Sequence, residues 1–147
     1  GIPLEGTDVP AMEELKDILH NSHCSCVVRN RGEVRQLYNR GIKDLHTIYT
    51  TERSLLNGAD IADKVVGRAA AALMILGGVK RVYTDVISHL ALDLLSKSSI
   101  EVSYKEAVPH IINRSQTDLC PMERATREID SLEDIFTIID DFVRSLA

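Results

Sequence analysis

The sequence predicts an α/β protein, a three-layer α/β/α sandwich built around one mixed sheet that starts with a β-hairpin. Two strand-like segments near the N-terminus are joined by a short turn, and two later ones are each reached through a helix-like segment. Strands connected through helices favour parallel pairing with helices on both faces, whereas a hairpin adds an antiparallel pair. The 147 residues suit a single domain, which we place at residues 12–147.

The first third of the chain predicts one helix and the hairpin. Residues 1–11 contain Gly and Pro without periodicity, and we expect a mobile lead-in there. Met12–His20 places its apolar residues on one helical face. Cys24–Arg29 and Glu33–Tyr38 predict paired strands, because Asn30-Arg31-Gly32 between them supplies a glycine where a positive φ costs little.

The middle of the chain predicts helices that alternate with strands. Ile42–Leu56 has helical spacing and predicts one or two short helices. Ile61–Leu76 predicts the strongest helix, because its second half is almost entirely apolar, and Gly77-Gly78 would end it. Val79–Ile87 predicts a strand, after which Ser88 would cap a helix that runs to about Lys97.

The last third predicts a strand and two helices. Ile100–Tyr104 has strand character, and a helix is expected from Cys120 to about Ile129. Ser131–Leu146 predicts an amphipathic helix, whose apolar stripe consists of Ile135, Ile138, Ile139 and Phe142. We expect this stripe to dock on the sheet of its own chain. Self-association into a homo-oligomer is the alternative.

Composition restricts the classes of function. Lys and Arg number 17 and Asp and Glu 22, so the net charge of −5 argues against binding to a nucleic-acid backbone. A single base or nucleotide in a pocket remains compatible with it. No apolar run approaches the length of about 18 residues that spans a membrane. The 3 cysteines form no disulfide framework, so we expect a cytoplasmic protein.

A first candidate site lies at the start of the predicted helix over Ile61–Leu76. Asp60 suits the N-cap and Asp63 the first turn, because acidic groups are stabilised at the positive end of a helix. Lys64 does not suit that position. Either a local ion pair offsets its charge, or the ammonium faces an anionic ligand.

A second candidate is Cys120-Pro121-Met122-Glu123. Proline favours the first helical position, which puts Cys120 at the N-cap and Glu123 at the third position, as in a capping box. A helix N-terminus lowers the pKa of a thiol, whereas a neighbouring carboxylate raises it. Cys120 is therefore a nucleophile, a metal ligand or a passive cap.

Other candidates carry weaker signals. Cys24 and Cys26 are predicted to share one face of a strand and to pack inward, because their spacing is not that of a zinc site. Ser88 and His89 lie where a strand leads into a helix, a place where α/β sheets commonly bind ligands.

Asn113 and Arg114 form a third weak candidate. They precede a polar loop and could hold an anion.

Four segments together resemble a poorly characterised, divergent branch of the cytidine-deaminase-like superfamily, a family of unknown function. They are Ala62-Asp63-Lys64-Val65-Val66-Gly67-Arg68-Ala69-Ala70-Ala71, Leu76-Gly77-Gly78-Val79, Ile111-Ile112-Asn113-Arg114 and Cys120-Pro121-Met122-Glu123. The resemblance runs from about Met12 to Asp134. It implies the three-layer sandwich of the deaminases, in agreement with the order of elements above.

Zinc deaminases carry His- or Cys-x-Glu at the start of one helix and Pro-Cys-x-x-Cys at the start of the next. By the order of elements, this chain has Asp63-Lys64 at the first place and Ser88-His89-Leu90-Ala91 at the second. The usual zinc ligands are therefore absent from both places. Zinc as a cofactor would need a rearranged site, with Cys120 as the one candidate ligand within a motif.

The resemblance and the candidates together predict a pocket for a nucleotide, nucleoside or similar small molecule at helix N-termini. We expect Asp63, Lys64, Cys120 and Glu123 to line it, with Asn113, Arg114, Ser88 and His89 as substrate contacts. In a deaminase-type hydrolase, Glu123 or Asp63 would be the general acid/base, Cys120 a ligand or nucleophile, and Lys64 an electrostatic stabiliser. The alternative is a non-catalytic binding or regulatory module on the same fold.

Overall fold

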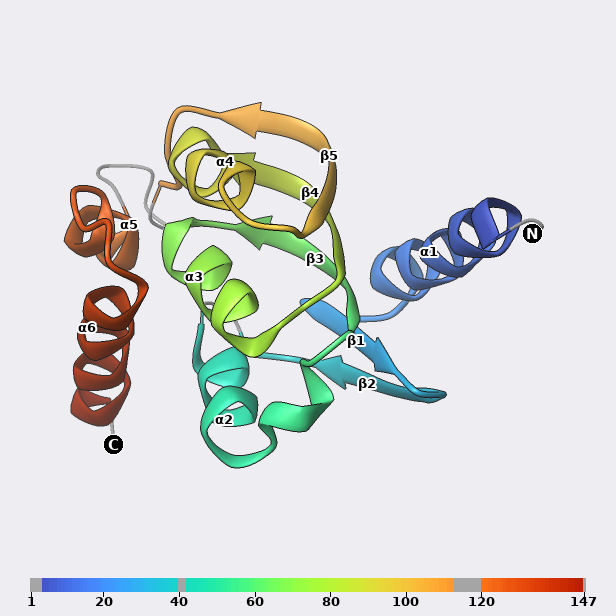
Figure 1. Ribbon diagram of the computed structural model, residues 1–147, viewed down its shortest axis with the longest axis horizontal. Helices are drawn as coiled ribbons and strands as arrows, with labels where there is room; N and C mark the ends of the chain where they lie inside the picture. The colour runs from blue at the N-terminus through green and yellow to red at the C-terminus, as the bar shows by residue number, and fades with distance from the viewer. Residues whose placement is uncertain (1–3, 40–41, 113–119, 147) are drawn as a thin grey trace.

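A five-stranded mixed sheet in the order β2-β1-β3-β4-β5 forms the centre of the structure (Figure 1). The computed structural model describes residues 4–39, 42–112 and 120–146, with the backbone alone for residues 4–11. Its strands are β1 (Cys26–Asn30), β2 (Glu33–Leu37), β3 (Asp60–Val66), β4 (Arg81–Ser88) and β5 (Glu101–Val108). β1 is antiparallel to both β2 and β3, whereas β3, β4 and β5 are parallel, so the predicted mixed sheet is confirmed.

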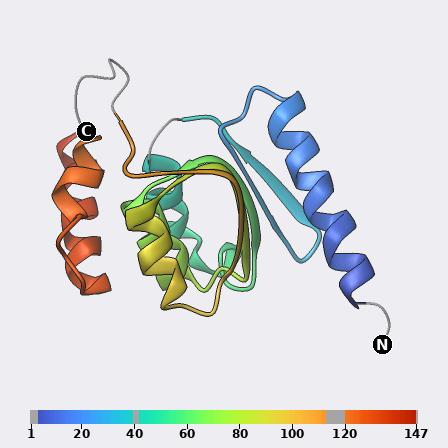
Figure 2. The ribbon, with the colours of Figure 1, turned by 90° about the horizontal axis from the view of Figure 1, so that it is seen from above.

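Helices cover both faces of the sheet. The elements are α1 (Leu4–Asn21), α2 (Lys43–Thr51), a 3-10 turn (Arg53–Leu55), α3 (Arg68–Gly77), α4 (His89–Ser96), α5 (Pro121–Thr126) and α6 (Leu132–Ser145). Figure 2 shows α1 on one face, α2, α3 and α4 on the other, and α5 and α6 outside the latter group. The predicted α/β/α arrangement is present, with an additional outer layer of helices.

The hairpin forms as predicted. Arg31 and Gly32 both have positive φ, at 51° and 84°, which is the backbone of the two-residue turn that suits the twist of paired strands. The side-chain amide of Asn30 donates hydrogen bonds to the carbonyls of Ser54, Leu55 and Asn57. This amide therefore ties the hairpin to the segment that leads into β3.

The prediction of one helix over Ile61–Leu76 is wrong in its first half, which is strand β3. This strand contains Asp60, Asp63 and Lys64, so neither alternation nor a continuous apolar run marks it, and its last apolar residues continue into those of α3. Gly67 separates the strand from α3, which ends at Gly77 and Gly78 as predicted. Asp63 and Lys64 accordingly lie on a strand. No helix dipole opposes the charge of Lys64 there, so this charge does not require a neighbouring anion.

The start of the first helix also differs from the prediction. α1 begins at Leu4 and not at Met12. Gly6 and Pro10 lie within it, and because proline inside a helix removes a backbone hydrogen bond, the composition of residues 1–11 did not indicate this extension. Leu15 and Leu19 are fully buried on the sheet with Val27, Ala62 and Tyr83, which form a small second core.

The prediction that the last helix docks on the sheet is wrong. α6 packs against α3 and α2, because these helices already cover that face of the sheet. Ile135 and Ile139 are fully buried in this contact. A hydrogen bond of 2.8 Å joins His46 Nε2 on α2 to Asp140 Oδ1 on α6, and Phe136 stacks on the ring of His46. Self-association through α6 stays a prediction.

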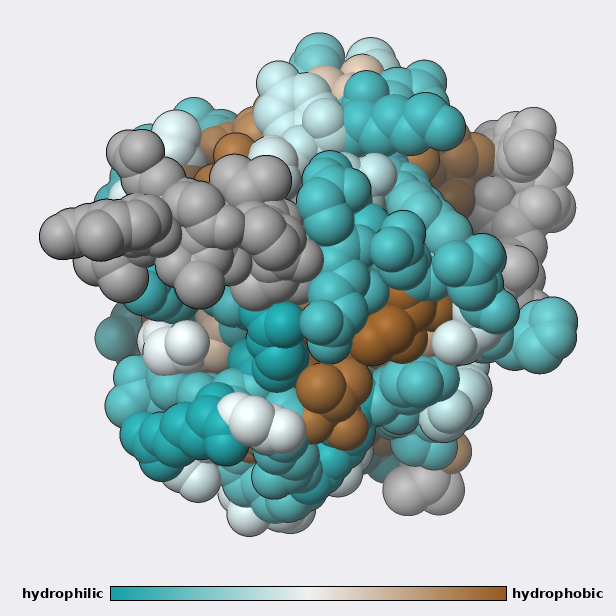
Figure 3. Space-filling view, turned by 90° about the vertical axis from the view of Figure 1, so that its right-hand side faces the viewer, coloured by the Kyte–Doolittle hydropathy of each residue, from teal (hydrophilic) through white to brown (hydrophobic). Residues whose placement is uncertain are grey.

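The surface is mainly hydrophilic on the side that carries α1 and the hairpin. Figure 3 shows hydrophobic groups on this side only in small, separate areas. None of the helices in the described part of the chain combines the length and the apolar character needed to cross a bilayer.

Candidate functional site

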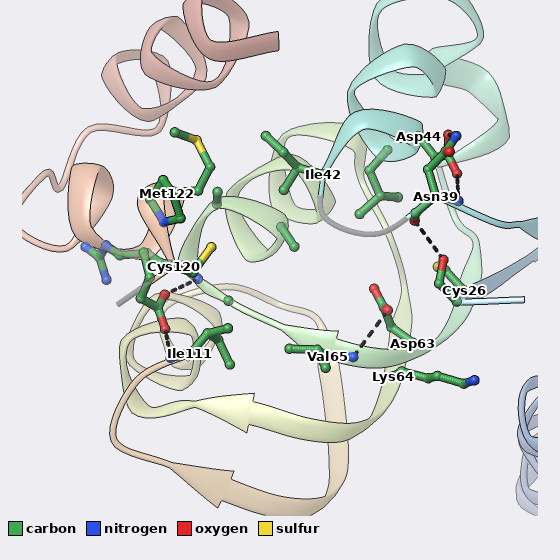
Figure 4. Close-up of a pocket in the computed structure, with 18 of the residues that line it drawn as sticks. Cys26, Asn39, Ile42, Asp44, Asp63, Lys64, Val65, Ile111, Cys120 and Met122 are labelled. Atoms are coloured by element: carbon green, nitrogen blue, oxygen red, sulfur yellow. Dashed lines mark hydrogen bonds between the residues drawn. The ribbon is translucent and has the colours of Figure 1, made fainter. Parts of the chain in front are cut away.

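A cavity of about 510 Å³ opens beside the carboxyl end of β3 (Figure 4). Its walls come from β1 and β3, the beginning of α3, the segment that leads into α2, and the segment that leads into α5. Most of the lining is apolar, with contributions from Leu37, Ile42, Leu45, Val65, Ala69, Ala70, Ile111, Ile112 and Met122. Ligand pockets typically have volumes of about 300–1,000 Å³ with a few polar groups, so the cavity has the size and character of a small-molecule site.

The cavity brings together four of the predicted site residues. Asp63, Lys64, Cys120 and Glu123 all contribute to its lining. Their side chains differ in orientation and in hydrogen bonding.

The other four predicted contacts are not among the lining residues that the structure describes. Ser88 is fully buried, and its hydroxyl accepts a hydrogen bond from the Ala91 N–H, so it caps α4 as predicted. His89 is exposed. Asn113 and Arg114 lie outside the described residues.

Asp63 places a carboxyl group at the cavity wall. Its side chain points into the cavity from β3, although the residue is only 9% exposed (Figure 4). Burial raises the pKa of this carboxyl to about 7, while the N–H groups of Val65 and Lys64 and the Cys26 thiol act in the opposite direction. Near neutral pH, Asp63 is therefore present in both its protonated and ionised forms.

Cys26 is the cross-strand partner of Asp63 in the β1–β3 pairing. Burial and the neighbouring Asp63 raise the pKa of its thiol well above the usual value, so the thiol stays protonated and donates to the carboxyl. The prediction that Cys24 and Cys26 share a face is wrong. β1 begins at Cys26, and Cys24 precedes the strand and packs into the core under α1.

Lys64 follows Asp63 on β3, and successive side chains of a strand point to opposite faces. Its side chain is exposed and extends away from the cavity in Figure 4. The Lys64 N–H donates to the Ser25 carbonyl at 3.1 Å. Lys64 lines the cavity, but its ammonium does not face it.

Glu123 joins the start of α3 to the segment around Ile111. The residue is 2% exposed, and its carboxylate accepts one hydrogen bond from the Arg68 N–H at 2.8 Å and another from the Ile111 N–H at 2.7 Å. The first of these bonds caps α3, whose N-cap residue, Gly67, has no side chain. A Cβ on Gly67 would lie 3.2 Å from Glu123 Oε1, so a glycine leaves room for the carboxylate.

Arg68 completes a reciprocal arrangement between α3 and α5. Its buried guanidinium donates to the carbonyls of Thr126 and Ile129 at the end of α5, and to the carbonyl of Leu90 on α4. A residue of α5 thus caps the start of α3, and a residue of α3 caps the end of α5. This pair of contacts fixes α5 at the edge of the cavity.

The predicted capping box within α5 is wrong. The Cys120 N–H donates to the Ile111 carbonyl at 2.9 Å and not to Glu123. Cys120 is the N-cap of α5, but its side chain makes no capping hydrogen bond, so it is not a passive cap. Its sulfur faces the cavity in Figure 4.

Replacing Glu123 with glutamine tests the capping role. Glutamine has one acceptor oxygen, so its NH₂ group would face one of the two N–H groups that the carboxylate now binds. We expect the free energy of unfolding to fall by about 2 kcal/mol, measured by urea unfolding. Glu128→Gln, at an exposed position after α5, is the control and should change it by less than about 0.5 kcal/mol. Equal effects of the two substitutions would contradict the capping role.

Sequence reasoning missed the remaining polar groups of the cavity. Both carboxylate oxygens of Asp44 accept hydrogen bonds from Asn39, at 3.0 Å from its N–H and 2.8 Å from its side-chain amide. The Ser25 hydroxyl donates to the Asn39 carbonyl at 2.9 Å. An Asn and an Asp five residues apart are typical of a loop that precedes a helix, so nothing in their spacing indicated a site.

The residues present do not fit the zinc site of the deaminases. The helices that follow β3 and β4 begin with Gly67-Arg68 and Ser88-His89, so the position of Asp63-Lys64 relative to a helix start was predicted wrongly. Glu123 already occupies the start of α3. In the described ranges, no three His, Cys, Asp or Glu side chains are grouped so that they could hold one metal ion.

Comparisons with known proteins show a matching family and a matching fold. The family model described as "TM1506: Domain of unknown function (DUF1893)" matches residues 14–143. A crystal structure of a DUF1893 family protein from Thermotoga maritima has a TM-score of 0.82, with 24% identity over 88% of each chain, and therefore shares the fold. No curated protein matches the sequence.

A further solved structure, the dCMP deaminase from the cyanophage S-TIM5, has a TM-score of 0.44 and 14% identity. The match covers 70% of this chain and 99% of the deaminase. Such a low score carries no argument, so the connection to the deaminases stays a prediction.

Proposed function

The chain belongs to the DUF1893 family, a family of unknown function, and from the geometry of its cavity we propose that it binds a small nitrogen heterocycle, such as a nucleobase or nucleoside. Asp63 is the polar anchor in this proposal. The observation that carries it is a carboxyl group buried at the wall of a largely apolar cavity, with no cation paired to it in the described part of the chain.

A planar heterocycle matches these walls. Its faces are apolar enough to pack against side chains such as Ile42 and Met122, while its edge presents N–H donors and nitrogen acceptors. Near neutral pH, Asp63 can accept a hydrogen bond as a carboxylate or donate one as a carboxylic acid. A buried polar group that can bind a further donor only from a ligand contributes strongly to selectivity.

An NMR titration tests the proposal. Cytosine and cytidine are expected to shift the backbone amide signals of Cys26, Val65 and Cys120. Asp63→Asn should weaken this binding by about tenfold or more, because the side chain keeps its shape but loses the charge and one acceptor. Asp17→Asn, on the exposed side of α1 across the sheet, is the matched control and should leave it unchanged. Shifts scattered over the surface, or none, would contradict the proposal.

A second candidate function is hydrolytic deamination of the bound heterocycle. The pKa of Asp63, at about 7, favours it, because a general acid/base works best when its pKa lies near the operating pH. Water would attack the ring carbon that bears the amino group while Asp63 accepts its proton. Asp63 would pass this proton to the departing nitrogen, which leaves as ammonia. The proton of the added hydroxyl moves to the neighbouring ring nitrogen, so that the ring carbon becomes a carbonyl. Ammonia release from cytidine that Asp63→Asn abolishes would support catalysis, whereas binding without release would indicate a binding or regulatory module.

A further inference from the structure

We infer that the ligand of this cavity is an unphosphorylated nitrogen base that binds as a cation, with an amidinium-type edge on the Asp63 carboxylate; this assignment of ligand class rests on the proposed function. An amidinium group presents two parallel N–H donors, which match the two oxygens of a carboxylate. The reasons are the signs of the charges around the cavity and the hydrogen bonds that each charged group already makes.

The charged side chains that face the cavity in the described structure are acidic. Asp44, Asp63 and Glu123 line it. The two basic residues that contribute to its lining direct their charges elsewhere. The Lys64 ammonium extends away from it, and the Arg68 guanidinium is bound to carbonyls of α4 and α5. Among the described residues, the local charge therefore favours a cation over an anion.

In two of these three acids, each carboxylate oxygen already accepts a hydrogen bond. Asn39 binds both oxygens of Asp44, and the N–H groups of Arg68 and Ile111 bind those of Glu123. Asp63 accepts a long bond of 3.4 Å from the Val65 N–H, and the Lys64 N–H and the Cys26 thiol also act on its carboxyl. Since a carboxylate has about four acceptor positions, Asp63 keeps capacity for a ligand on the side that faces the cavity.

The start of α3 does not reverse this preference. The N-terminus of a helix carries a partial positive charge and commonly binds anions. Here the Glu123 carboxylate already binds the first N–H of α3. A phosphate placed at the start of α3 would meet the Glu123 carboxylate, so like charges oppose a phosphorylated ligand there.

Three compounds of nearly one shape test the charge preference. Benzamidine, benzamide and benzoate carry charges of about +1, 0 and −1 near neutral pH on the same ring. We expect benzamidine to shift the amide signals of Cys26 and Val65, with an affinity about tenfold or more above that of benzoate. Asp63→Asn should remove most of the advantage of benzamidine over benzamide, whereas Asp17→Asn should preserve it.

The outcomes separate this inference from the proposed function. Equal or tighter binding of benzamide or benzoate, or binding of cytidine without binding of benzamidine, would overturn the cationic class and leave the pocket itself intact. If cytidine 5′-monophosphate bound more tightly than cytidine at these residues, the cavity would be assigned to phosphorylated ligands. If no compound, cytidine included, shifted the cavity residues, the proposed function would fail together with the inference.

Discussion

Replacing Arg68 with methionine is expected to lower the free energy of unfolding by about 4 kcal/mol. Arg68 is 2% exposed, and its guanidinium serves the carbonyls of Leu90, Thr126 and Ile129. Methionine would occupy a similar volume but donate nothing, so these carbonyls would lose their partner. Such a loss is a large fraction of the roughly 5–15 kcal/mol that stabilises a domain.

Urea unfolding followed by circular dichroism gives this free energy. Arg144→Met is the matched control, because Arg144 is exposed at the end of α6 and pairs only with Asp140 among the described residues. The control should change the free energy of unfolding by less than about 1 kcal/mol. A loss below about 1 kcal/mol for Arg68→Met would show that the guanidinium does not hold α5 in place. If the variant does not fold, Arg68→Lys, which keeps the charge but has fewer donors, should show a partial loss.

Local signals predicted those elements whose ends are fixed by a few neighbouring residues. The hairpin follows from its turn, α4 from the Ser88 cap, and α6 from its apolar stripe. Each of these depends on interactions within about four residues, so the pattern in the sequence contains the cause.

Strand β3 was missed because its cause is not local. Helices α1 and α3 cover its two faces, and the strand buries Asp60 and Asp63 while Val65 is exposed, so polar and apolar residues do not alternate. The docking of α6 was misassigned for a related reason. An apolar stripe shows that a helix is covered on one face, but not whether a sheet or other helices cover it.

Some of the predicted residues line one cavity, but the contacts that they make there were not predicted. Asp63, Cys120 and Glu123 do meet at one cavity, yet Glu123 and Arg68 cap each other's helices across more than fifty residues of sequence. The Cys26–Asp63 pair depends on the register between β1 and β3, which requires knowing that β3 is a strand. Helix caps from residues distant in the sequence, and the register between strands, leave no pattern in a single sequence.

Replacing Asp63 with asparagine is expected to stabilise the protein at alkaline pH while changing little at acidic pH. The pKa of Asp63 is about 7 in the folded state against the usual 3.8, so the folded protein holds this proton where the unfolded chain releases it. Below about pH 4 the carboxyl is protonated in both the folded and the unfolded state, so its ionisation does not affect the free energy of unfolding. Between about pH 4 and pH 7 the carboxyl ionises in the unfolded state but stays protonated in the folded state. This ionisation stabilises the unfolded state, so the free energy of unfolding falls as the pH rises.

Above about pH 7 the folded state must also carry a buried charge, and the loss of stability becomes constant at about 4 kcal/mol. Asparagine resembles the protonated carboxyl and never ionises, so the variant avoids this loss. We expect the difference between variant and wild type to grow from near zero at about pH 4 to several kcal/mol at about pH 8, in urea unfolding at each pH. Asp17→Asn, at an exposed site, should show no such growth. Parallel pH profiles for Asp63→Asn and the wild type would mean that water or a neighbouring group already solvates the carboxylate, and Asp63 would then lose its place as the anchor of the cavity.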